Sequence, residues 1–177
     1  MQRIGTWSEY DHVAIIVKQR FLPEEVWFFE ATQDGVWYRN WGSKSFGTSS
    51  IKQLVGNFYY KVVLRKLKFE KTEKLREKLN EFCAKVEGNP YMLSYWDQMG
   101  LVSKESVVGS FVEQGRGFFC SELVAKAYKY TGIMEPTEDS SSNFNPVHFS
   151  SDYQTVKLIE GATLSKEKLI VINNDYS

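Results

Sequence analysis

Cys120 is the residue in this chain whose type and setting point most directly to chemistry. It is one of two cysteines among 177 residues, and it opens a segment, 120–130, whose apolar spacing predicts a helix ending at Gly132. The free N–H groups and the dipole of a helix N-terminus stabilise an anion by up to about 1 kcal/mol, which favours a nucleophilic thiolate. The same N–H groups can hold a developing oxyanion, so Ser121 is a candidate for binding the substrate or its oxyanion.

A nucleophilic thiolate needs a base nearby and a group that fixes the orientation of that base. His12 is one of only two histidines, and it opens the apolar segment 12–18, which is predicted as a buried strand. Glu30 lies in the next predicted strand, 25–32, where a carboxylate among aromatic residues needs a partner because burying it unpaired is costly. An imidazole on the neighbouring strand is such a partner, and the bond would set the ring's tautomer. These placements predict a catalytic triad with Cys120 as nucleophile.

Each of these residues also has a purely structural interpretation. A cysteine on a helix face is more often a core residue than a nucleophile, a strand histidine is often structural, and Glu30 could point to solvent. His148, in a polar loop after a proline, is the rival base, and Asn40 is the next candidate for the orienting group. Tyr10 lies two residues before His12 on the same predicted strand face, so it could hydrogen-bond an intermediate or simply pack.

The elements that must position these residues are short strands followed by helices. An Asp34-Gly35 pair after the second strand predicts a hairpin turn. The other expected elements are strands at 36–41, 58–68, 155–159 and 168–172, a helix at 71–86 and a polar loop at 136–152. Cys83 lies beside the apolar stripe of the 71–86 helix and is expected to be a packing residue. This order of elements predicts one α+β domain over residues 1–177.

The composition of the chain limits which binding partners, cofactors and cellular compartment are expected. Basic and acidic residues number 22 each, so the net charge gives no argument for a nucleic-acid partner. No CxxC or His/Cys cluster has metal-ligand spacing, and neither a metal nor a cofactor is expected. The first residues lack the apolar core of a signal peptide, and no stretch is long enough to span a membrane, so we expect a cytoplasmic protein. Aromatic residues make up 15%, which is compatible with a groove for acyl chains and is explained equally well by core packing. Peripheral membrane contact is left open as a separate expectation.

Three segments carry a recognisable pattern: an apolar strand opened by a histidine, an acidic residue before a small one, and a cysteine that opens a helix. They read Tyr10-Asp11-His12-Val13-Ala14-Ile15-Ile16-Val17, Phe29-Glu30-Ala31 and Phe119-Cys120-Ser121-Glu122-Leu123-Val124. Together they resemble the circularly permuted branch of the NlpC/P60 superfamily of papain-like cysteine hydrolases, which includes YiiX-like, poxviral and lecithin:retinol acyltransferase-related members. The segment 145–149 looks like that family's proline-containing segment, so the likeness covers about residues 7–152. One departure is that the family usually carries a Gly-Asp strand roughly 20 residues or more before the histidine, whereas this sequence has eleven residues before His12 and no Gly-Asp pair among them.

The resemblance implies a permuted papain-like fold, in which a mostly antiparallel sheet packs against the helix that carries the catalytic cysteine. It implies a cysteine hydrolase of the peptidase or amidase type, which cleaves an amide, ester or thioester bond through an acyl-enzyme on Cys120. In that case His12 is the base, Glu30 orients it, and the substrate is a peptide or an acyl lipid. Two alternatives stay open. One is a lipid acyltransferase or thioesterase of the same fold, and the other is a non-catalytic module that binds a lipid or a peptide.

Overall fold

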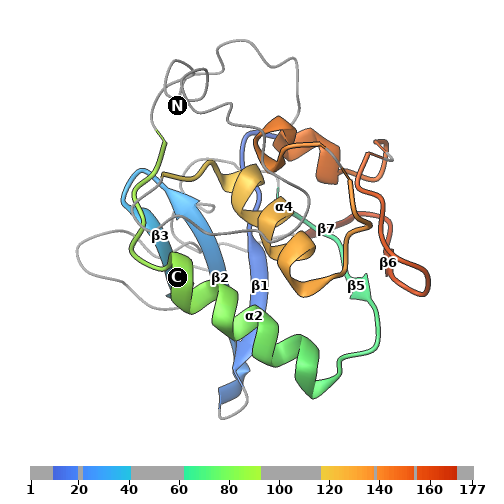
Figure 1. The fold of residues 1–177 in the computed structure, drawn as a ribbon, viewed down its shortest axis with the longest axis horizontal. Coiled ribbons are helices and arrows are strands. Elements are labelled where there is room, and N and C mark those ends of the chain that lie inside the picture. Colours follow the sequence, from blue (N-terminus) through green and yellow to red (C-terminus); the bar gives the residue numbers. More distant parts are fainter. Residues whose placement is uncertain are drawn as a thin grey trace, which may run out of the picture.

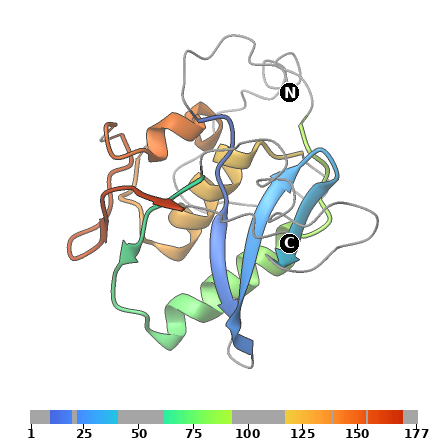
Figure 2. The ribbon, with the colours of Figure 1, turned by 180° about the vertical axis from the view of Figure 1, so that it is seen from behind.

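A computed structural model of the chain describes residues 10–19, 22–40, 62–92, 117–137, 139–153 and 155–170. These residues form a mixed α+β structure with small antiparallel sheets and two α-helices, labelled α2 and α4 in Figure 1. Figure 2 shows the largest sheet from the other side. The predicted α+β class is confirmed at this level. No helix within the described ranges is long and apolar enough to cross a membrane.

Three consecutive strands form an antiparallel meander in which β2 lies between β1 and β3. The strands are β1 (Ile15–Gln19), β2 (Leu22–Thr32) and β3 (Gly35–Asn40). Phe29 pairs with Ile15 on one side and with Tyr38 on the other, so these three residues share one face of the sheet. Phe29 is fully buried on that face, whereas the next residue, Glu30, is buried on the opposite face.

The hairpin between β2 and β3 forms where the Asp34-Gly35 pair predicted it. Gly35 has a φ of 104°, a left-handed conformation that glycine adopts without steric cost. A Cβ at this position would lie 2.8 Å from the carbonyl oxygen of Asn89, just beyond α2. The backbone N–H of Val36 donates to that same oxygen at 2.9 Å. Glycine therefore allows the hairpin to dock closely on the end of α2.

α2 spans Glu73–Val86 and packs its apolar stripe against the sheet. The hydroxyl of Thr72 caps the helix by accepting a hydrogen bond from the N–H of Leu75 at 3.2 Å. The buried residues of α2 join the core with residues of β2 and β3; they are Phe82, Cys83 and Val86. The predicted packing role of Cys83 is therefore confirmed.

α4 spans Cys120–Thr131 and is buried along both flanks, which makes it the central helix of the described structure (Figure 1). Two groups of its residues fill two core clusters. Leu123 and Ala127 pack toward the sheet and α2, whereas Val124 and Ala125 pack toward Phe144 and Phe149. The helix ends at Gly132, which has a φ of 75°. The predicted start at the cysteine and the predicted end at the glycine are both confirmed.

Two small two-stranded sheets complete the fold, together with two short 3₁₀ helices. The pairs are β4 (Val62–Leu64) with β7 (Lys168–Ile170) and β5 (Leu67–Lys68) with β6 (Thr163–Leu164), and the 3₁₀ helices are η1 (Ser141–Asn143) and η2 (Pro146–Phe149). Arg65 lies between β4 and β5 and ties these elements together. Its guanidinium donates to four backbone carbonyls, those of Phe149, Ser150, Leu164 and Ser165, at 2.7–3.3 Å.

Two of the expected strands were wrong. The single strand predicted at 58–68 is split into β4 and β5 because Arg65 leaves the ladder to bind those carbonyls; residues 58–61 lie outside the described ranges. The segment 155–159 makes only one bridge, from Leu158 to Met134, and the strand β6 follows it instead. The polar loop at 136–152 contains η1 and η2. The strand predicted at 168–172 is confirmed for its described part, 168–170.

Candidate active site

Cys120 is the first residue of α4, and it is 4% exposed. Burial alone would raise the pKa of its thiol. The hydrogen bond and the positive charge of His12 oppose that effect, as do hydrogen bonds from the backbone N–H groups of Val13 and Ser121, and together they lower the pKa. The helix N-terminus and the segment before β1 therefore both surround the sulfur with donors. This setting favours the thiolate.

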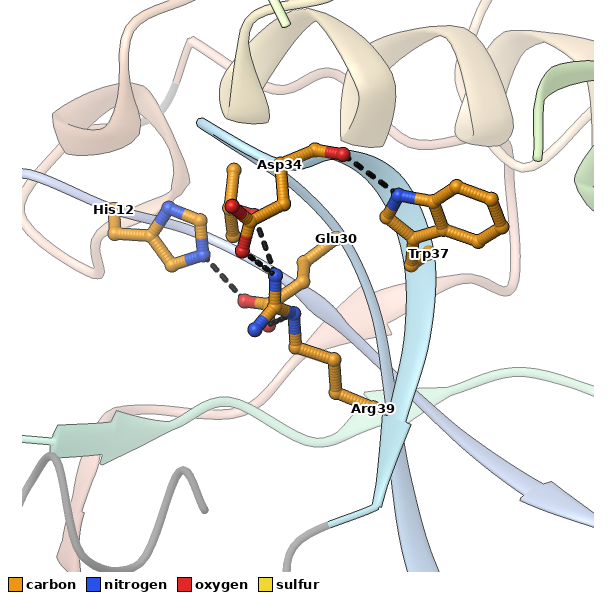
Figure 3. Close-up of polar contacts among 6 residues, drawn as sticks. His12, Glu30, Asp34, Trp37 and Arg39 are labelled. Atoms are coloured by element: carbon orange, nitrogen blue, oxygen red, sulfur yellow. Dashed lines mark hydrogen bonds and ion pairs between the residues drawn. The ribbon is translucent and has the colours of Figure 1, made fainter. Parts of the chain in front are cut away.

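His12 lies three residues before β1, in a segment without ladder bonds, rather than at the start of a strand as predicted. The reason is a contact between segments far apart in the sequence, because the N–H of Val13 is directed to the sulfur of Cys120. Nε2 of His12 lies 2.7 Å from Oε2 of Glu30, so Nδ1 is the ring nitrogen left for the thiol (Figure 3). Burial disfavours the imidazolium, but the interactions with Cys120 and Glu30 outweigh it and raise the pKa of His12 to about 10.

Glu30 lies on β2 with its side chain 8% exposed, and each of its two carboxylate oxygens contacts a different residue. Oε2 contacts His12, and Oε1 lies 3.2 Å from Nε of Arg39 on β3. The register explains the second contact. Glu30 pairs with Trp37, and Arg39 lies two residues further along β3 on the same face, which is the diagonal neighbour across an antiparallel pair. The predicted contact between His12 and Glu30 is thus present, and Arg39 joins it.

Arg39 was missed by the sequence analysis. Its signal was a basic residue directly after the aromatic pair Trp37-Tyr38, two positions beyond the residue that pairs with Glu30. Finding it required the strand register, because the pairing alone decides which residue of β3 reaches the carboxylate.

Tyr91 is a second residue near the site that the sequence analysis did not single out for chemistry. It bridges Phe118 in a parallel arrangement, and its ring meets the ring of Phe119 edge-on at 6.1 Å. Burial, together with the negative charge of Cys120, raises the pKa of Tyr91 to about 12. Gly117 closely approaches the Met92 backbone, since a Cβ there would lie 3.2 Å from the Met92 nitrogen.

Of the remaining predicted residues, Tyr10, His148 and Asn40 have hydrogen-bond partners of their own. The hydroxyl of Tyr10 donates to Glu167 at 2.5 Å, and Ser121 is buried beside the nucleophile. Nδ1 of His148 accepts a hydrogen bond from the N–H of Asn145 at 3.0 Å within its own turn, and Asn40 donates to Glu25 at 2.8 Å. The oxyanion roles of Tyr10 and Ser121 stay predictions.

Cys83 gives an internal contrast to Cys120. It is 1% exposed in the core, where burial raises the pKa of its thiol to about 11 despite a hydrogen bond with Tyr38. The two thiols are therefore shifted in opposite directions, and only one of them has an imidazole partner among the interactions that set its pKa.

Chemically, the assembled groups can supply a thiolate, a proton donor and acceptor, and a carboxylate that fixes the imidazole. Among the described residues no group of three or more His, Cys, Asp or Glu side chains is placed to hold a metal ion. No protein-family model matches the chain, and no curated protein or solved structure matches it.

Proposed function

We propose that this protein is a cysteine-dependent hydrolase of permuted papain-like fold, which cleaves an amide, ester or thioester bond through an acyl-enzyme on Cys120. The observation that carries the proposal is the position of His12. Its ring interacts with Cys120 on one side and with Glu30 on the other, at the N-terminus of a central helix. A histidine placed only for packing would not need both contacts.

The acylation half of the reaction uses the thiolate and the imidazolium. The sulfur of Cys120 attacks the substrate carbonyl carbon, a C–S bond forms, and the carbonyl electron pair moves onto oxygen. The intermediate collapses by breaking the bond to the leaving group, which takes a proton from His12. The substrate's acyl part is then a thioester on Cys120, and His12 is neutral.

The deacylation half restores both groups. Neutral His12 takes a proton from water, whose oxygen attacks the thioester carbonyl carbon, and collapse expels the Cys120 thiolate. The products are the free acid and the original thiolate–imidazolium pair. A peptide and an acyl lipid both fit this scheme as substrates. If an alcohol or amine replaces water, the same intermediate leads to acyl transfer.

Trapping the intermediate tests the proposal. The purified protein would be mixed with activated acyl thioesters and aminoacyl esters, quenched in acid, and analysed by mass spectrometry with peptide mapping. We expect an acyl adduct on Cys120 that decays in water, no adduct in Cys120→Ser, and an unchanged pattern in Cys83→Ser. Absence of any Cys120 adduct across the panel, with reversible binding retained, would support the binding-module alternative instead.

A further inference from the structure

Arg39 is a buried arginine whose described partners all lie at or near the β2–β3 hairpin. Its side chain is 10% exposed. Nη2 donates to Oδ2 of Asp34 and to Oγ1 of Thr32, both at 2.8 Å. Nε lies 3.2 Å from Oε1 of Glu30, as an ion pair without hydrogen-bond alignment. The guanidinium therefore contacts both the turn and the carboxylate of the candidate site.

These contacts connect the turn to the nucleophile through one continuous set of polar groups. Figure 3 shows Asp34, Arg39, Glu30 and His12 in sequence, and the ring of His12 in turn interacts with Cys120. Each oxygen of Glu30 is assigned to a different neighbour. A rotation of the carboxylate that improved one contact would weaken the other.

The contact between Arg39 and Glu30 matters because a buried carboxylate carries a negative charge. A buried carboxylate needs a cation, and removing its partner is strongly destabilising. In the proposed reaction His12 is a cation only while it holds its proton, so for part of each cycle it cannot serve as that partner. An arginine side chain does not take part in the proton cycle and keeps its positive charge. Arg39 is the group that can accompany Glu30 through the whole cycle.

We infer that Arg39 is a positioning residue of this site, which holds the Glu30 carboxylate in place and directed at His12 while the imidazole gains and loses its proton. The inference rests on the proposed function, because it concerns the proton cycle of His12. The competing structural explanation is that Arg39 only fastens the hairpin through Thr32 and Asp34.

The neighbouring titratable groups must be included in any pH test. In the described part of the chain, Glu30 is met by His12 from the segment before β1 and by Arg39 from β3, and Arg39 is also met by Asp34 from the turn. Cys120 on α4 is the next group beyond His12. Without Arg39, the carboxylate of Glu30 loses one of its two partners and is held less firmly against His12, and it then favours the imidazolium–thiolate pair less.

The test measures the rate of Cys120 alkylation by iodoacetamide as a function of pH, with the adduct located by peptide mapping. The variants are Arg39→Met, Arg39→Lys, Glu30→Gln and the double variant Arg39→Met/Glu30→Gln. Arg76→Met is the matched control, since Arg76 is 52% exposed and pairs only at 3.9 Å with Glu73. Slow alkylation of buried Cys83 reports that each variant keeps its core.

We expect the acid limb of the Arg39→Met profile to move up by about one pH unit, so that the rate on that limb falls about tenfold. Arg39→Lys should move the acid limb less in the same direction, because lysine keeps the positive charge but lacks the planar set of N–H donors of the guanidinium. In the Glu30→Gln background, Arg39→Met should cause no further shift. Arg76→Met should match the wild type.

Three results would overturn the inference. The first is an Arg39→Met variant whose pH profile of Cys120 alkylation is unchanged. The second is an Arg39→Met shift of equal size in the wild-type and the Glu30→Gln backgrounds. The third applies if Arg39→Met does not fold, and it is an Arg39→Lys variant with the wild-type profile. Failure of the proposed function has a different signature. In that case wild-type Cys120 itself would alkylate no faster than Cys83, before any variant is considered.

Discussion

His12 and Glu30, 18 positions apart in the chain, meet through a 2.7 Å contact between Nε2 and Oε2. The contact joins a segment outside the sheet to a residue near the C-terminal end of β2. It occupies one ring nitrogen and leaves the other for Cys120, so it sets which nitrogen can exchange a proton with the thiol.

The first prediction compares Glu30→Gln with His12→Ala. Glu30→Gln should reduce hydrolysis of an activated thioester by about 10- to 100-fold, because a glutamine oxygen can still accept the bond from His12 but carries no charge. His12→Ala should abolish turnover. Steady-state kinetics on one substrate, with circular dichroism as a control for folding, provides the measurement. If Glu30→Gln kept full activity while His12→Ala had none, Glu30 would be structural.

The second prediction concerns the pH dependence of stability. The raised pKa of His12 contributes stability that is fully present below 6.5 and is lost as pH rises through about 10. The lowered pKa of Cys120 contributes stability that is fully present above 9.0 and is lost as pH falls through its native value. The sum is largest, and nearly constant, between 6.5 and 9.0.

Urea unfolding of the wild type and of Cys120→Ala at several pH values measures this contribution. The difference in free energy of unfolding between the two proteins should be greatest from pH 6.5 to 9.0 and should shrink both at more acidic pH and near pH 10. A difference that does not vary with pH would show that the two groups do not form a charged pair in the native state.

Features of this site that depend on neighbouring residues in the sequence were predicted, and those that depend on residues far away in the sequence were predicted less completely. The start of α4 at Cys120 and its end at Gly132 are local features, governed by apolar spacing and a glycine cap, and both were predicted. The contact between His12 and Glu30 followed from the cost of burying a lone carboxylate. The same reasoning predicted His12 inside the strand, whereas it lies before β1. The backbone N–H of the next residue, Val13, bonds to the distant thiol of Cys120 instead of to a neighbouring strand.

Features that depend on strand register or on distant partners were missed. Arg39 reaches Glu30 only because the β2–β3 register makes them diagonal neighbours. Tyr91 approaches Cys120 because its backbone bridges Phe118, across 27 residues of sequence that no local pattern connects. The split of the 58–68 segment likewise comes from Arg65. The backbone carbonyls that accept its hydrogen bonds lie 84 to 100 residues away in the sequence.

The third prediction concerns the docking of the hairpin on α2. Gly35→Ala should lower the free energy of unfolding by about 2 kcal/mol or more, because it adds strain at positive φ and a clash with the Asn89 carbonyl. Gly161→Ala is the matched control, since Gly161 has a φ of 82° but open space around it. It should cost only about 1 kcal/mol. Equal costs in urea unfolding would mean that the backbone around Asn89 yields without resistance.

The central claim, that His12 activates Cys120, is tested most directly by measuring iodoacetamide alkylation of both cysteines at pH 7 in the wild type and in His12→Ala. Cys120 should react at least about 100-fold faster than Cys83 in the wild type, because the pKa of one thiol is lowered and that of the other is raised to about 11. In His12→Ala most of that advantage should disappear while Cys83 stays slow. Equal rates for the two thiols in the wild type, or an undiminished Cys120 rate in His12→Ala, would contradict the claim.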